Sequence, residues 1–211
     1  MALDFLAILD KSTASKAITF DARQPVFRQG QSVRWLYRIT HGRLRLSRVL
    51  ARGSEIVLAR VSDCEILAEA SVFAAHYHCD AFAESRSLLQ RYPMRDIHAL
   101  LNCHPGAAVA YSAHLATQIM ELRAMIEIRA IRRADDRLLT WLRFRSRGTP
   151  PSFDGHGLWS SVAKEIGLTG ESLYRALATL QRAGKIERTG GKVVLPGQQP
   201  PRQRPINVVI S

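Results

Sequence analysis

The stretch from Gly157 to Ile186, GLWSSVAKEIGLTGESLYRALATLQRAGKI, limits the possible folds of this 211-residue chain more than any other segment. It predicts two short helices with a tight turn at Gly167, because glycine enters left-handed backbone conformations at little cost. Thr169 lies where the cap of the second helix belongs. Four apolar residues of that helix recur at helical spacing and are expected to face a core: Leu173, Ala176, Leu177 and Leu180.

The remaining residues of the second helix are mostly polar, and they are expected to point outward: Gly170, Glu171, Ser172, Tyr174, Arg175 and Thr179. A helix with one apolar stripe and an outer face of Glu, Ser, Tyr and Arg suits the reading of base edges in a DNA major groove. The alternative is an ordinary helical hairpin whose charges face water. The candidate DNA-binding residues are Thr169, Gly170, Glu171, Ser172, Tyr174, Arg175, Lys164 and Lys192.

A small β-hairpin is predicted directly after these helices. Two short strand patterns, in residues 184–188 and 192–195, flank Gly190 and Gly191, a favoured pair for a two-residue turn. A helix-turn-helix followed by such a wing is a more specific pattern than either part alone.

Charge is unevenly distributed along the chain. The net charge is +12, and residues 129–211 carry fifteen Lys or Arg against six Asp or Glu. The positive field therefore accompanies the predicted helix-turn-helix, where binding to phosphates would use it. No apolar run approaches the ~20 residues that a bilayer requires, and the acidic N-terminus does not have the pattern of a signal peptide. Three cysteines fit a reducing cytoplasm.

Between Lys16 and Pro93 the pattern changes to short β runs separated by turn residues, after a short apolar N-terminal helix. Eight strands are expected: 17–20, 26–28, 36–40, 43–49, 55–61, 66–68, 81–84 and 88–91. Many short strands at such spacing predict a β-roll, that is, a double-stranded β-helix or jelly roll. The expected fold class is α+β.

A short helix at 94–101 and a long helix at about 106–131 are expected next. The long helix carries a 4-3-4 apolar repeat typical of a coiled-coil seam: Leu115, Ile119, Leu122 and Ile126. A second stripe of Tyr111, Met125 and Ile128 lies beside it. One stripe is expected to pack within the chain and the seam to meet a second copy, although a single buried helix would also explain the pattern.

The chain is therefore divided into a sensor domain at 1–104, a dimerisation helix at 105–131 and a winged helix-turn-helix domain at 132–196. A charged break at 132–136 is expected to act as a hinge. Asp135 and Asp136 are expected near the start of the next helix, which continues through 138–144. Residues 146–155 are predicted to be a loop. The Pro-rich, basic segment 197–211 is predicted to be flexible because its composition cannot build a core.

This order of parts resembles the bacterial regulators typified by the cyclic-AMP receptor protein and the fumarate-nitrate regulator, the Crp/Fnr family. The residues that carry the resemblance are FRQGQSVRWLYRITHGRLRL (27–46), ILAEASVF (66–73) and LTGESLYRALATLQRAGKI (168–186). The resemblance implies a cytoplasmic, homodimeric, DNA-binding transcription regulator, and not an enzyme. It does not decide between activation, which would need contact with RNA polymerase, and repression.

Glu171 and Arg175 match base-reading positions of that family, which implies a palindromic operator with TGA-like half-sites. Gly170 and Tyr174 depart from the contact residues of some members, and Gly170 cannot touch a base through a side chain. Arg can pair bidentately with guanine, and Glu can accept from a cytosine amino group.

The resemblance also places an effector pocket at Ala68, Glu69, Ala70, Ser71, Cys79, Asp80, Leu122 and Arg123. Members that bind cyclic AMP have Gly-Glu followed by Arg-Ser in the segment that binds the phosphate, here called the effector cassette. Here Ala68 replaces the Gly, and Cys79 with Asp80 replaces Arg-Ser. An anionic phosphate would then lose a guanidinium and meet a carboxylate, so cyclic AMP is not the expected ligand. The true effector stays open.

His76, His78 and Cys79 offer nitrogen and sulfur ligands to a metal ion at this cassette. A metal- or redox-responsive regulator is thus an alternative, as is a set of ordinary turn residues, because neighbouring strand residues point to opposite faces. An iron–sulfur cluster of the family's four-cysteine type is excluded by a count of three cysteines. A metal-dependent enzyme is a third alternative, but no nucleophile motif or phosphate-binding loop supports it.

Overall fold

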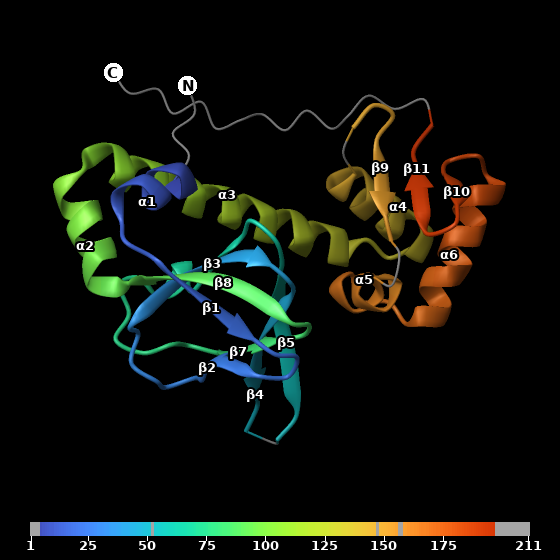
Figure 1. The fold of residues 1–211 in the computed structure, drawn as a ribbon. Helices are drawn as coiled ribbons and strands as arrows, with labels where there is room; N and C mark the ends of the chain where they lie inside the picture. Colours follow the sequence, from blue (N-terminus) through green and yellow to red (C-terminus); the bar gives the residue numbers. More distant parts are fainter. Residues whose placement is uncertain (1–4, 52, 147, 156–157, 197–211) are drawn as a thin grey trace. The chain divides into compact units, whose positions relative to one another are not determined.

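A computed structural model describes residues 5–51, 53–146, 148–155 and 158–196 (Figure 1). The chain forms two compact units, residues 1–116 and 117–211. Gly157 and the segment 197–211, predicted to be flexible, lie outside the described residues. In the described residues, no helix is both long enough and apolar enough to span a membrane.

The first unit begins with α1 (Phe5–Ser12) and continues through eight strands. These are β1 (Lys16–Phe20), β2 (Pro25–Phe27), β3 (Trp35–His41), β4 (Leu44–Val49), β5 (Glu55–Val61), β6 (Ile66–Leu67), β7 (Asp80–Ala83) and β8 (Ser87–Pro93). All eight predicted strands are confirmed. Strand β6 ends one residue early because Ala68 adopts a positive φ of 74° and leads into the 3-10 helix η1 (Glu69–Ser71).

Two antiparallel four-stranded sheets make up the β-roll, in the orders β1-β8-β3-β6 and β2-β7-β4-β5. Apolar side chains from both sheets form one core: Phe20, Phe27, Tyr37, Ile39, Leu44, Leu67, Ala68, Tyr77, Cys79, Ala81, Ala83 and Leu89. Alternation along each strand sends one set of side chains into this core and the other set outward. The pairing of β3 with β8 places Tyr37 opposite Arg91.

Helices cover one end of the roll. They are α1, α2 (Met94–Cys103) and the first turns of α3 (Pro105–Ala130). A second core joins them to β3 and β8 through residues such as Phe5, Leu36, Tyr92, Ile97 and Tyr111. The structure thus confirms the predicted short helix and long helix after the strands.

The second unit contains the last part of α3, then α4 (Ala134–Arg145), β9 (Ser152–Asp154), α5 (Trp159–Glu165), α6 (Gly170–Arg182), β10 (Glu187–Thr189) and β11 (Lys192–Val194). Helix α3 ends at Ala130 and α4 begins at Ala134, so the predicted break at 132–136 is shorter than expected and its last three residues are the first turn of α4. The predicted β-hairpin is confirmed as β10 and β11. The prediction that residues 146–155 form only a loop is wrong. Strand β9 lies there and completes a sheet in the order β10-β11-β9.

Aromatic packing explains why β9 forms in a Pro- and Gly-rich segment. Phe153 of β9 is the register partner of Val193 in β11. Its ring meets Trp141 and Trp159 at centroid distances of 4.9 and 5.7 Å. A single partly buried aromatic ring therefore attaches this segment to the core, which strand periodicity over only three residues could not reveal.

Candidate nucleic-acid interface

Thr169 caps α6 as predicted. Its Oγ1 accepts a hydrogen bond from the backbone N–H of Ser172 at 3.1 Å. Gly167 has a φ of 68°, which confirms the predicted left-handed turn between α5 and α6. The four residues predicted to face the core, Leu173, Ala176, Leu177 and Leu180, are all buried. The second helix of the motif is thus fixed in place along one side and at its N-terminus.

The outward face of α6 is available for binding. The side chains of Glu171 and Arg175 are 79% and 71% exposed, and Tyr174 is 53% exposed. Arg175 lies 3.7 Å from the Glu171 carboxylate, one helical turn away. An exposed pair at this spacing is worth only about 0.3–0.5 kcal/mol, so a base could displace either partner at little cost. Gly170 is exposed and has open space around its Cα.

Ser172 makes contacts within the first turn of α6. It is half-buried, and its Oγ accepts a hydrogen bond from the Thr169 hydroxyl at 2.9 Å and is contacted by Arg175 at 3.5 Å. These contacts support the helix cap and the position of Arg175, and the predicted DNA contact of Ser172 stays a prediction. Lys164 and Lys192 are exposed, and neither forms an ion pair with a described residue.

Three arginines form hydrogen bonds with residues at the end of α5. From the sequence they were predicted only to contribute positive charge. Arg137 donates to the carbonyls of residues 166–167 at 3.2 and 3.1 Å. Arg129 donates to the carbonyl of Glu165 at 2.8 Å, and Arg145 contacts the carboxylate of that residue at 2.9 Å. Cations are favoured at this end of α5 by its dipole and unpaired carbonyls. Part of the basic surplus is therefore structural.

The two apolar stripes of α3 have different surroundings. Tyr111 and Ile128 are buried, and Met125 packs on the core of the second unit. In the predicted seam, Ile119, Leu122 and Ile126 are 49%, 63% and 69% exposed. Leu115 is the exception, because it packs on the core of the first unit. Met120, at 55% exposed, extends the open apolar surface.

The predicted effector cassette is built around η1. Ala68 keeps the left-handed conformation that glycine favours, in agreement with its alignment to a family glycine. Tyr111 donates a hydrogen bond to the carbonyl of Glu69 at 2.8 Å, and burial raises the pKa of the Glu69 carboxyl. Ala70 is exposed and Ser71 is buried. The other two predicted members, Leu122 and Arg123, are exposed residues of α3 in the second unit.

Cys79 and Asp80, which replace the family Arg-Ser pair, are already buried or paired with other residues of the chain. Cys79 is 1% exposed, and burial raises the pKa of its thiol to about 11. Asp80 accepts from the N–H of Gln29 at 2.7 Å and lies 3.8 Å from Arg28. The positive charge of Arg48 acts in the opposite direction and lowers the pKa of the Cys79 thiol. The Arg48 guanidinium donates a hydrogen bond to the backbone carbonyl of His78 at 2.8 Å.

The predicted metal ligands do not converge. His76 is exposed in an isolated bridge with Ser32, and the His78 ring lies 3.2 Å from the Ser71 hydroxyl. Among the residues that the structure describes, no group of three or more His, Cys, Asp or Glu side chains is arranged to hold a metal ion. The three-ligand hypothesis is therefore not supported by the geometry of His76, His78 and Cys79.

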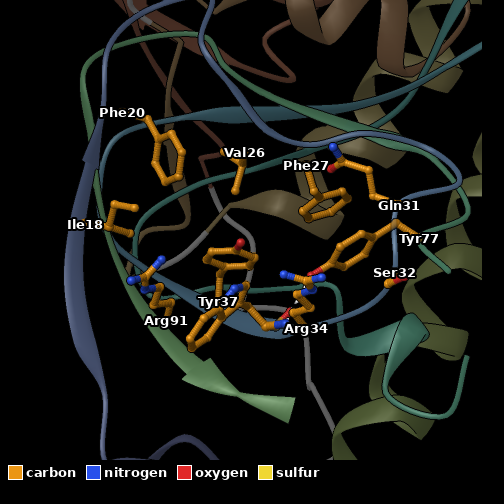
Figure 2. A pocket seen from close by; sticks show the side chains of 11 residues that line it. Ile18, Phe20, Val26, Phe27, Gln31, Ser32, Arg34, Tyr37, Tyr77 and Arg91 are labelled. Carbon is orange, nitrogen blue, oxygen red and sulfur yellow. Dashed lines mark hydrogen bonds between the residues drawn. The ribbon is translucent and has the colours of Figure 1, made fainter. Parts of the chain in front are cut away.

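Sequence reasoning missed a cavity of about 510 Å³ elsewhere in the β-roll (Figure 2). It shares no residue with the predicted effector pocket. Its lining comes from β1, β2, β3, β8 and the loops beside them: Ile18, Phe20, Val26, Phe27, Gln31, Ser32, Arg34, Trp35, Tyr37, Tyr77 and Arg91. The aromatic residues were visible in the sequence, but strand alternation does not tell a filled core from a hollow one.

Known proteins are similar to the β-roll alone and to most of the chain. Residues 17–104 match the family described as a cyclic nucleotide-binding domain. A global nitrogen regulator of Synechocystis sp. strain PCC 6803 is 26% identical over 188 residues, which cover 84% of this chain and 83% of that protein. FixK2 from Bradyrhizobium japonicum has a TM-score of 0.70 at 15% identity, with 87% of this chain and 93% of that chain covered. A CooA mutant from Carboxydothermus hydrogenoformans has a TM-score of 0.69 at 14% identity, covering 91% and 90%.

The first unit is thus a β-roll of the cyclic-nucleotide-binding class, followed by helices and a small sheet. The family match covers residues 17–104, and the similarity to the Synechocystis global nitrogen regulator extends over most of the chain. FixK2 and the CooA mutant share the fold of this chain, whereas the Synechocystis regulator is similar to it in sequence.

Proposed function

We propose that this protein is a sequence-specific, DNA-binding transcription regulator, and not an enzyme. The observation that carries the proposal is the N-terminal half of α6, which is capped by Thr169 and presents Glu171, Tyr174 and Arg175 to solvent. Helices α5 and α6, with the β10–β11 hairpin, form a winged helix-turn-helix in this reading. The fixed buried stripe of α6 holds these side chains at a constant register, as base reading requires.

The active species is proposed to be a homodimer that pairs through α3. The exposed stripe of Ile119, Leu122 and Ile126 is an apolar surface at coiled-coil spacing. In a two-fold dimer the two α6 helices enter successive major grooves, about 34 Å apart. The operator is then a palindrome with TGA-like half-sites, with Arg175 on a guanine and Glu171 on a cytosine amino group.

The β-roll is proposed to sense the signal that controls DNA binding. Cyclic AMP is a poor candidate at the cassette, because Cys79 is a buried neutral thiol and Asp80 is a carboxylate already paired with Arg28. The similarity over most of the chain to a protein named a global nitrogen regulator supports a regulatory role, and it does not identify the effector of this chain.

Salt-dependent binding to duplex DNA tests this function. Lys164→Ala and Lys192→Ala should each weaken binding to all sequences alike and lower the slope of log affinity against log salt by about 1, because each removes one phosphate contact. Lys11→Ala, an exposed change in the first unit, is the matched control and should leave the slope unchanged. No binding of the full chain to duplex DNA at low salt would contradict the proposal, as would slopes equal to the control in both variants.

A further inference from the structure

The wall of the β-roll cavity is mainly aromatic. Phe20, Phe27, Trp35, Tyr37 and Tyr77 all line it. The rings of Phe27 and Tyr77 are stacked, with centroids 3.9 Å apart and planes 12° from parallel. Figure 2 shows Phe20 and Phe27 along one side of the space and Tyr37 on the other. Flat aromatic walls favour a planar ring, through stacked or edge-to-face contact.

Among the described residues, the charged side chains that line the cavity are both cationic, Arg34 and Arg91, and none is a carboxylate. The Arg91 guanidinium lies 4.4 Å from the centroid of the Trp35 ring. Its Nε is buried and has no hydrogen-bond acceptor among the described residues, which also supply no ion-pair partner for this arginine. A buried donor without an acceptor is costly, so a ligand that supplies an acceptor would gain affinity there.

Two further features favour a ligand over a purely structural void. The volume of about 510 Å³ lies within the range of small-molecule sites. The cross-strand register sets Tyr37 opposite Arg91, so a phenol and a guanidinium meet at the same place. Burial raises the pKa of Tyr37, which keeps its hydroxyl a neutral hydrogen-bond donor.

We propose that this cavity is a binding site for a small aromatic carboxylate. The ligand ring lies among the aromatic side chains, and its carboxylate accepts hydrogen bonds from Arg91, as guanidinium–carboxylate pairs do. Arg34, which is exposed at the cavity wall, adds positive charge that attracts the anion.

Calorimetric titration of the full-length protein tests the site with defined probes. Benzoate, phenylacetate and indole-3-acetate present one carboxylate on rings of increasing size. At least one should bind, and it should bind at least about tenfold more tightly than its uncharged amide or than cyclohexanecarboxylate, which lacks the aromatic face. Quenching of tryptophan fluorescence gives a second readout, because Trp35 lies in the wall.

Variants locate the binding within the cavity. Arg91→Gln should weaken binding of the best probe by at least about tenfold, while Arg86→Gln, an exposed change outside the lining, should not. If Arg91→Gln does not fold, Arg91→Lys replaces it. That variant keeps the charge but loses bidentate pairing, so it should weaken binding severalfold.

Three results would overturn the proposal: no probe bound at low millimolar concentration, equal affinity for acid and amide, or unchanged affinity in the folded Arg91 variant. These titrations contain no DNA, so their outcome does not depend on whether the protein binds DNA.

Discussion

The three cysteines differ in what their surroundings allow them to do. Cys79 is buried in the core of the β-roll, whereas Cys64 and Cys103 are exposed. The thiolate is the reactive form of cysteine, and burial with a pKa of about 11 leaves only about one Cys79 in a thousand ionised at pH 8. A redox role for Cys79 would therefore require the fold to open.

Thiol titration with an aromatic disulfide reagent measures this difference. At pH 8 two thiols per chain should react quickly, and the third should react only after unfolding in guanidinium chloride. The Cys79→Ser variant should keep both fast thiols and lose the slow one. A third fast thiol in the native wild-type protein would show that Cys79 is accessible, and the redox alternative would gain support.

Arg137 connects α4 to the turn of the helix-turn-helix. It donates to the carbonyls of residues 166–167 and, through Nε, to the carbonyl of Ile131 at 2.8 Å. Arg137→Ala should lower the free energy of unfolding by about 1.5–3 kcal/mol, because it removes hydrogen bonds from a charged donor at a half-buried site. Chemical denaturation provides the measurement. Arg132→Ala, at an exposed neighbouring position, is the control, and equal effects of the two changes would refute the assignment.

Among the elements, those with a strong period or a cap were predictable. The α6 stripe, the Thr169 cap, Gly167 and the Gly190–Gly191 turn all follow from local chemistry, and the structure confirms them. Strand β9 was not predictable, because three residues give no period and its stability comes from Phe153 packing on distant tryptophans. The roles of Arg137 and its neighbours were hidden for the same reason: their partners are backbone carbonyls remote in sequence.

The proposed dimer interface lies on α3 and can be tested by substitution. Replacing Leu122 and Ile126 together by Glu should convert the protein to monomers, because the seam would bury four unpaired like charges. Sedimentation velocity reports the change. Glu127→Lys alters the charge of the same helix at an exposed position off the stripe, and it should leave the dimer intact. A dimer that survives the double substitution would place the interface elsewhere.

For the whole chain, the order of the elements could be predicted from the sequence, but the cavity in the β-roll could not. Eight short strands, a long helix and a helix-turn-helix follow from turn residues and periodicity along the sequence. The cavity in the β-roll draws its lining from four strands and their loops, so no single stretch contains its pattern. Whether a ring of apolar side chains is filled or hollow depends on how two sheets pack, which is a property of the complete fold.

The central claim is that α6 reads DNA as one half of a symmetric pair, and binding-site selection from a random duplex library tests it most directly. The wild-type protein should enrich a palindrome whose half-sites lie one helical turn apart. Arg175→Ala should still bind, with a loss of about 1–3 kcal/mol and relaxed preference at one G·C pair in each half-site. Failure of the wild-type protein to enrich any palindrome, or an unaltered preference in the variant, would contradict the claim.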